Sequence, residues 1–244
     1  MNEVPGQRRP SWPTLVVASA LTLTCAVVAG VASSAAGAEL TRGPSAAELD
    51  RAAADEMTRR WQVWPAGRIF PESISYAAEQ GGEEKAHRVG ISTETRCDRG
   101  VDAGLRKALR RADCRAVLRA TYLDALQGIV VTVGVVAFAG ESGAVAVERT
   151  LPRGGRPSPG LKALAFPGTV TDRFTSAGRQ NSLVRQAGPY VVMSTVGQTD
   201  GRPAKAVGEQ RPTMFAFAGD IADRILAGLS TPARPDCASR EWRC

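Results

Sequence analysis

The sequence predicts an α+β domain with a mainly antiparallel sheet covered by helices, preceded by one N-terminal transmembrane helix. An uncharged run occupies residues 14–37, helix-period segments lie near both ends of the remaining chain, and short apolar segments lie between them. Helices interspersed with strands of hairpin length favour this fold class. We therefore expect a cytoplasmic tail (1–13), a transmembrane anchor (14–37), a linker (38–45), one extracytoplasmic α+β domain (46–230) and a C-terminal disulfide tail (231–244).

The run at residues 14–37 has the length of a membrane span. At 1.5 Å per residue it reaches about 36 Å, against a hydrocarbon core of about 30 Å. Arg8 and Arg9 precede it and Glu39 follows it. Positive charge before a span favours a cytoplasmic N-terminus. We expect a single-pass protein of the cell membrane with its C-terminal domain outside the cytoplasm.

A cleaved secretory signal is the alternative for the same run. Ala36, Gly37 and Ala38 form a small-residue cleavage site, and cleavage after Ala38 would secrete the rest of the chain. Signal peptides usually have apolar regions of about 7–15 residues. The uncharged run here is longer, which favours an uncleaved anchor. Both alternatives export the domain.

The first helix of the domain is predicted at residues 46–63. Ser45 and Glu48 match a capping box at its start. Apolar residues recur every three or four positions on one face, namely Leu49, Ala53, Met57, Trp61 and Trp64. Prolines and a glycine then end the helix and introduce an extended segment at 68–77. A second strand is expected at 87–92.

The middle of the chain predicts one helix and two strands. Residues 101–113 have an apolar face and a basic face, which is typical of a short surface helix. Residues 114–124 alternate, so we expect a half-buried strand whose polar face, with Arg119 and Thr121, meets solvent. Residues 129–138 are continuously apolar and β-branched, which predicts a central strand covered on both faces.

The last part of the domain should complete the sheet and cover it. We expect a helix at 142–151, a loop at 152–160, and strands at 162–169, 181–186 and 189–197, with a hairpin at Ala187 and Gly188. The closing helix, 217–229, has an apolar stripe every four residues. Its members are Phe217, Ile221, Ile225 and Leu229.

Four of the five cysteines lie beyond the span, where an oxidising environment favours disulfides. Three pairings are possible, and short loops favour Cys97 with Cys114 and Cys237 with Cys244. The alternative is a zinc site, which the spacing disfavours because no C-x-x-C motif occurs and the single histidine is not near any cysteine. We expect no metal.

The formal charge of +7 suggests an anionic partner. A cationic exported domain suits lipid headgroups, an anionic envelope polymer or an envelope protein, and export argues against nucleic acid. The strongest candidate patch is the basic face of helix 101–113. It comprises Arg106, Lys107, Arg110 and Arg111. The alternative is an ordinary helix exterior with the Arg-rich composition of a high-GC genome.

The nearest catalytic pattern is AFAGESGA, residues 137–144, which places Ser142 between a strand and a helix. A nucleophile elbow requires G-x-S-x-G and a downstream histidine. Gly143 and Ala144 follow Ser142, and His87 lies upstream. We therefore expect Ser142 to be a helix N-cap and His87 to be solvated. Nucleotide, dinucleotide and calcium motifs are absent, so no cofactor is expected.

Two further sets of residues are candidates for contacts. Aromatic side chains can line a ligand groove or fill the core, and the set comprises Trp61, Trp64, Tyr76 and Tyr190. In the span, Ala26, Gly30 and Ser34 repeat at four-residue spacing, which allows close approach of a partner helix. Chance in an alanine-rich span is the alternative explanation.

Three segments, WQVWPAGRIFP, CRAVLRATYLD and GPYVV, resemble exported or membrane-anchored proteins of high-GC actinobacteria. The resemblance implies an envelope location and carries no assigned activity. The predicted function is a membrane-tethered extracytoplasmic binding or interaction module of the cell envelope, non-catalytic and of unknown ligand. A serine hydrolase that uses Ser142 is the alternative.

Overall fold

The computed structural model describes residues 12–152, 154–203 and 212–236. The chain divides into two units, one that ends at Glu48 and one that begins at Leu49. The first contains α1 (Trp12–Thr41), in which Leu15–Leu40 is long and apolar enough to cross a membrane. Helix α1 is therefore longer at both ends than the predicted 14–37.

Polar side chains within α1 bond to the helix itself. The hydroxyls of Thr22, Thr24 and Ser33 donate to backbone carbonyls one turn earlier, at 3.0, 2.8 and 2.7 Å. Such bonds satisfy hydroxyl groups where no water is present. They make the composition of α1 compatible with a hydrocarbon environment.

The predicted capping box forms at the start of α2 (Ala46–Val63). The backbone N–H of Ser45 donates to Glu48 Oε2 at 2.7 Å, and the backbone N–H of Glu48 donates to Ser45 Oγ at 3.4 Å. Three residues of the predicted stripe, Met57, Trp61 and Trp64, are partly buried against the main core. The fully buried residues of α2 lie beside them and are Ala52, Glu56 and Arg60.

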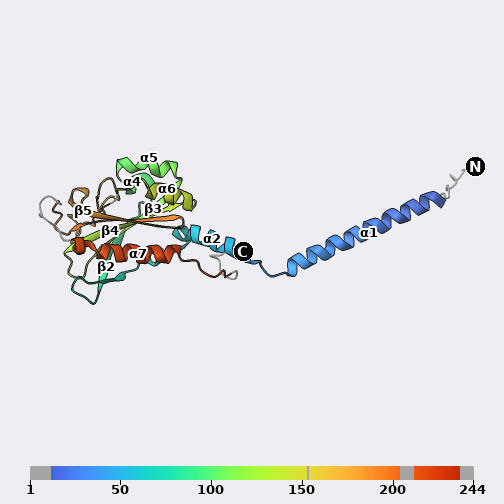
Figure 1. The fold of residues 1–244 in the computed structure, drawn as a ribbon, viewed down its shortest axis with the longest axis horizontal. Coiled ribbons are helices and arrows are strands. Elements are labelled where there is room, and N and C mark those ends of the chain that lie inside the picture. The colour runs from blue at the N-terminus through green and yellow to red at the C-terminus, as the bar shows by residue number, and fades with distance from the viewer. Residues whose placement is uncertain (1–11, 153, 204–211, 237–244) are drawn as a thin grey trace, which may run out of the picture. The chain divides into compact units, whose positions relative to one another are not determined.

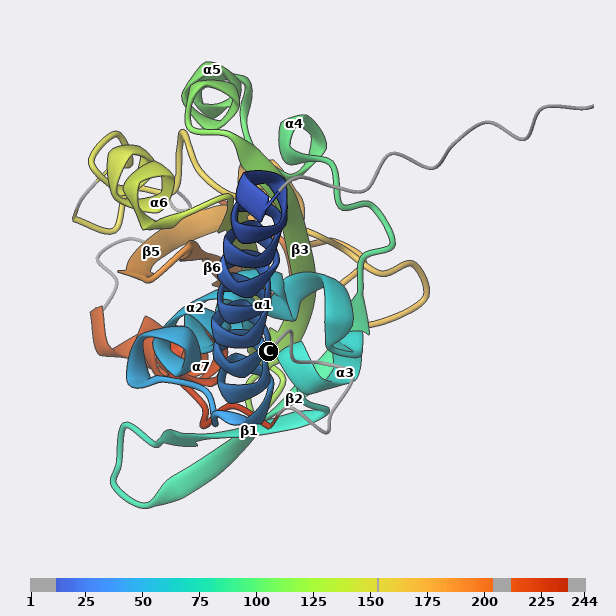
Figure 2. The same cartoon turned by 90° about the vertical axis from the view of Figure 1, so that its right-hand side faces the viewer.

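The second unit is built on a six-stranded sheet in the order β1-β2-β3-β4-β6-β5, with every neighbouring pair antiparallel. The sheet is curled, with α7 on its concave side and α4, α5 and α6 on the other (Figures 1 and 2). This confirms the predicted fold class.

The strands are β1 (Ser73–Ala77), β2 (Glu83–Ile91), β3 (Cys114–Leu123), β4 (Ile129–Phe138), β5 (Arg179–Ala187) and β6 (Tyr190–Gln198). The remaining helices are α3 (Ala66–Ile69), α4 (Cys97–Gly100), α5 (Ala103–Arg111), α6 (Glu141–Glu148), α7 (Phe217–Ser230) and the 3₁₀ turns η1 (Ser176–Gly178) and η3 (Pro212–Phe215).

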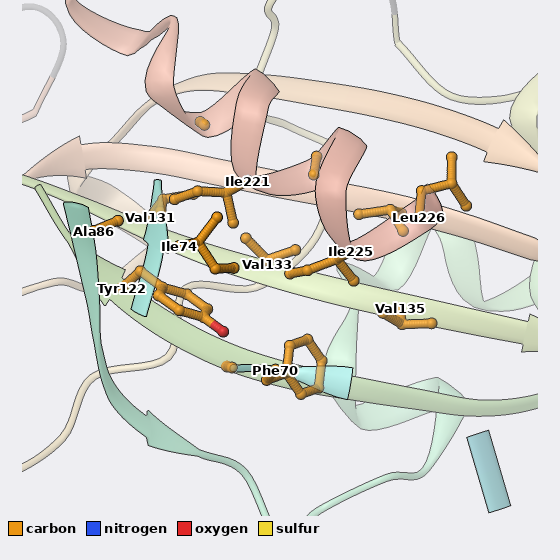
Figure 3. Close-up of a cluster of buried hydrophobic side chains, with 14 of the residues drawn as sticks. Phe70, Ile74, Ala86, Tyr122, Val131, Val133, Val135, Ile221, Ile225 and Leu226 are labelled. Carbon is orange, nitrogen blue, oxygen red and sulfur yellow. The ribbon is translucent and has the colours of Figure 1, made fainter. Parts of the chain in front are cut away.

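The main core lies between the concave face and α7. Alternate residues of β4, including Val133 and Val135, face Ile221 and Ile225 of α7 (Figure 3). All four residues of the stripe predicted for the closing helix are buried. β4 itself is buried along nearly its whole length between β3 and β6, which confirms the central strand.

The other face of the sheet carries a second core. Val136 and Phe138 of β4 are buried there with Leu105 and Leu109 of α5. A disulfide between Cys97 and Cys114 joins the start of α4 to the start of β3. The first predicted pairing is thereby confirmed.

The strand predicted at 162–169 is wrong, because this segment crosses the face of the sheet instead of pairing at its edge. The Thr121 hydroxyl donates to the Leu164 carbonyl at 2.7 Å, and the Leu164 N–H donates to Thr132 Oγ1 at 3.0 Å. Gly134 allows the close approach, since a Cβ there would lie 2.4 Å from Leu161 Cδ1. Side chains of β3 and β4 thus bond to the backbone of Leu164 in place of a neighbouring strand.

The prediction that the polar face of β3 meets solvent is also wrong, because residues 161–174 cover that face. Arg119 and Thr121, expected in solvent, are 7% and 0% exposed. The alternation of β3 was read correctly, but its second face is covered by residues 161–174 rather than by water. A smaller correction concerns 68–77, where α3 precedes the extended part.

Candidate binding groove between β1 and α7

The outer edge of β1 offers backbone groups to a ligand. Arg88 N–H donates to the Glu72 carbonyl and Ala78 N–H to the Gly82 carbonyl, so even-numbered residues of this strand bond to β2. In an antiparallel ladder the alternate residues then point their N–H and C=O groups away. Ser73 and Ser75 are such residues, and within the described chain their outward groups have no partner.

Helix α7 closes one end of this edge. The N–H of Ala77, the third outward residue, donates to Asp220 Oδ2 at 2.8 Å. On the opposite edge of the sheet, Arg185 of β5 pairs with Asp223 at 2.8 Å. Helix α7 therefore contacts both edges of the curled sheet, and along β1 the Ser73–Ser75 part remains open.

Beside these two serines is a groove of about 340 Å³. It lies between β1, the C-terminal half of α7, and α3 with the residues that flank it. Apolar side chains from all three line it. They are Ile69, Ile74, Ile225 and Leu229.

Two arginines and one tryptophan line the same groove. Arg68 and Arg224 are exposed, and the guanidinium carbon of Arg68 lies 3.6 Å from the Trp64 ring centroid. Arg224 forms no ion pair with any described residue. Guanidinium groups bind carboxylates and phosphates in a bidentate manner. The groove therefore combines an apolar lining with a preference for negative charge.

A buried ion pair fixes the wall that carries Trp64. Arg60 and Glu56 of α2 are both 2% exposed and are joined by a 2.7 Å contact. Arg60 Nη1 also donates to the carbonyls of Gly228, Leu229 and Thr231 at 3.1, 2.9 and 2.7 Å. A guanidinium at a helix C-terminus satisfies carbonyls that have no partner within the helix. α2 is thereby tied to the end of α7.

Tyr190 provides a second tie to the same wall. Its hydroxyl donates to the Met57 carbonyl at 2.6 Å and accepts the Trp61 N–H at 3.4 Å. Burial raises the pKa of Tyr190 to about 12, so the donating hydroxyl persists at neutral pH. These contacts join β6 to α2, next to the wall that carries Trp64.

The predicted aromatic set divides between the groove and the core. Trp64 lines the groove, while Tyr190 is buried and Trp61 packs against the main core. Tyr76 is buried, and its hydroxyl lies against Glu84 and accepts the Ala125 N–H at 3.1 Å. The ligand-groove hypothesis thus fits one of the four aromatic residues.

The predicted basic patch lies elsewhere. Lys107, Arg110 and Arg111 are exposed on α5 and Arg106 is partly buried, while Leu105 and Leu109 face inward. α5 covers the face of the sheet opposite to α7 (Figure 1). None of the four residues lines the β1–α7 groove.

Ser142 and His87 do not come together. His87 pairs in register with Leu123, which pairs with Val130 near the start of β4. Ser142 follows the other end of β4, beyond Phe138. His87 is exposed, as expected, but Ser142 is not the N-cap, because α6 begins at Glu141 and Gly140 occupies the cap position.

The remaining candidates have mixed outcomes. Cys25 is unpaired on α1, and the predicted bond between Cys237 and Cys244 lies outside the described residues. Within the described ranges, no three His, Cys, Asp or Glu side chains are placed to hold a metal. Ala26, Gly30 and Ser34 are exposed on α1, so their contact with a partner helix stays a prediction.

No local sequence pattern predicts the arginines and serines of the groove. Arg68 and Arg224 belong to different parts of the chain and meet only through the packing of α7 on β1. The backbone groups of Ser73 and Ser75 point outward because of the register between β1 and β2. Sequence periodicity does not specify which residues of an edge strand bond to its neighbour. Glu56 and Arg60 are four residues apart, a spacing that suits an ion pair within a helix, and this was the one sequence signal for the buried contact beside the groove.

Comparison with protein-family models, curated proteins and solved structures finds no match to this chain. The resemblance to actinobacterial exported proteins therefore stays a prediction. The candidate site rests on its geometry.

Proposed function

We propose that this protein is a membrane-tethered, extracytoplasmic binding module of the cell envelope, and that its ligand occupies the β1–α7 groove. The observation that carries the proposal is the combination, in one groove, of an apolar lining, two arginines and an open strand edge. Ligand sites are typically concave and apolar with a few well-placed polar groups. The groove fits that description better than the exterior of α5.

Two features support the extracytoplasmic location. α1 has the length and composition of a membrane span. The Cys97–Cys114 disulfide is typical of an exported protein, because the cytoplasm keeps thiols reduced. Arg8 and Arg9 then orient the N-terminus toward the cytoplasm.

The proposed partners are an envelope protein or an anionic envelope polymer. A hydrolase is less well supported, since the register of the sheet separates Ser142 from His87 by the length of β4. The groove has no nucleophile paired with a base among its lining residues, whereas it has the features of a recognition site.

Photo-crosslinking in living cells tests this function. A benzophenone amino acid replaces Ser75 in the groove in one strain and Lys107 on α5 in a matched control strain. We expect adducts at position 75 that decrease when Arg224→Glu reverses the charge of the groove wall. Adducts only at position 107, or adducts at 75 that are insensitive to Arg224→Glu in a folded protein, would contradict the assignment.

A further inference from the structure

We infer that the ligand of the groove is an extended peptide segment with an acidic side chain, which binds as an additional strand along β1. This inference rests on the proposed function and specifies the chemistry of its ligand.

The backbone of β1 offers both donors and acceptors at strand spacing. Ser73 and Ser75 each present one outward N–H and one outward C=O. A neighbouring strand bonds to alternate residues through both groups, so these two positions accommodate two doubly bonded pairs. Asp220 already occupies the N–H of Ala77, which sets the limit of the added strand.

The apolar lining lies where the side chains of such a strand would point. Ile74, between the two serines, faces the main core with Ile225 and Leu229. The residue opposite Ile74 in an added strand points to the same side of the sheet, because successive side chains alternate. An apolar side chain at this position extends the core over the groove.

The arginines select for negative charge beside that apolar contact. Arg68 and Arg224 line the groove from two sides, α3 and α7. A charged hydrogen bond between a guanidinium and a carboxylate is about twice as strong as a neutral one. Arg224, which has no ion-pair partner in the described part of the chain, is the stronger contributor to specificity.

A peptide fits these groups better than a phosphate headgroup or an anionic polysaccharide. Either of those ligands can pair with the arginines. Neither supplies backbone donors at strand spacing for the carbonyls of both Ser73 and Ser75. Bare strand edges are normally covered in stable proteins, and a bound strand supplies that cover.

The test measures peptide affinity for the full chain in nanodiscs of neutral phosphatidylcholine. The probe is a dye-labelled, end-blocked peptide with the sequence Thr-Val-Thr-Glu-Thr, in which the valine and the glutamate are two residues apart and so point to the same side of the strand. One control peptide has every internal amide N-methylated, and another has glutamine in place of the glutamate. We expect N-methylation to abolish binding and glutamine to weaken it about tenfold.

Two variants locate the binding. Ser75→Pro removes an outward N–H at a position where an edge strand tolerates proline, and we expect it to lower the affinity for the probe about tenfold. Arg224→Gln should lower the affinity for the glutamate peptide and leave the affinity for the glutamine peptide unchanged. Thermal unfolding of both variants checks that the fold is retained.

Several outcomes would overturn the inference. Equal binding of the N-methylated peptide would show that strand pairing is not used. Binding of phosphatidylglycerol vesicles through Arg224, without binding of any peptide, would identify a headgroup site. If position 75 still forms adducts in cells under either result, the groove remains the binding site and only the strand mode is wrong.

Discussion

At the scale of residues, the buried pair of Glu56 and Arg60 should contribute strongly to stability. Glu56→Gln leaves Arg60 buried and without its carboxylate. Loss of one partner of a buried pair costs about 3–5 kcal/mol. The exposed pair of Arg185 and Asp223 is the control, and Asp223→Asn should cost less than about 1 kcal/mol. Denaturant unfolding of the detergent-solubilised chain, followed by tryptophan fluorescence, measures both, and similar losses would contradict the role of the buried pair.

The tyrosines predict the behaviour of the protein at alkaline pH. Burial raises the pKa of Tyr190 and of Tyr76 to about 12, and raises the pKa of Tyr122 as well. Unfolded tyrosine ionises near pH 10. Since the folded pKa values are higher, their stabilising effect is complete below about pH 10 and is lost as the pH rises toward 12.

The chain contains only these three tyrosines, so ultraviolet titration reports on all of them. We expect no tyrosinate absorbance near pH 10 and a steep rise together with unfolding at higher pH. A gradual rise with a midpoint near the ordinary pKa of about 10 would show that the hydroxyls are exposed.

At the scale of elements, the attachment of residues 161–174 to β4 should depend on Thr132 and not on Thr195, its neighbour on β6. Thr132→Val removes the acceptor of the Leu164 N–H and should destabilise the fold by about 1–3 kcal/mol. Thr195 is opposite Thr132 on β6, and its buried hydroxyl has no partner in the described chain. Thr195→Val should therefore be neutral or stabilising. Equal losses in urea unfolding would contradict the account.

Elements with local signals were predictable from the sequence. α2 and β4 have the predicted bounds, because a capping box and a β-branched apolar run act within a few residues. The segment at 162–169 looked like a strand by composition, but threonines more than thirty residues away satisfy its backbone. Composition does not distinguish these two uses of an apolar segment.

The candidate site was less predictable than the fold. The buried stripe of α2 is offset from the predicted one, because it contains Glu56 and Arg60, and a search for apolar periodicity does not select charged residues. The groove depends on the register of β1 and on where α7 packs, and both are long-range properties. Trp64 was identified as a candidate, whereas its arginine and serine neighbours were not.

At the scale of the whole molecule, α1 predicts a single-pass protein with its domain outside the cytoplasm. Protease added to protoplasts should degrade the C-terminal domain, since the arginines that precede α1 favour an N-terminus inside. A cytoplasmic protein serves as the control for intact cells. Full protection of the domain would contradict this orientation, and a mature N-terminus at Glu39 would show secretion instead of anchoring.

The central claim is that the β1–α7 groove of an exported domain is occupied in the cell envelope. Hydrogen exchange of the full chain in right-side-out envelope vesicles, compared with the purified chain in nanodiscs, tests it most directly. We expect slower exchange in the envelope for residues 73–75, where the outward amides are open, and no change at residues 103–111 of α5. Unchanged exchange in β1 together with new protection in α5 would contradict the claim and would assign binding to the basic helix.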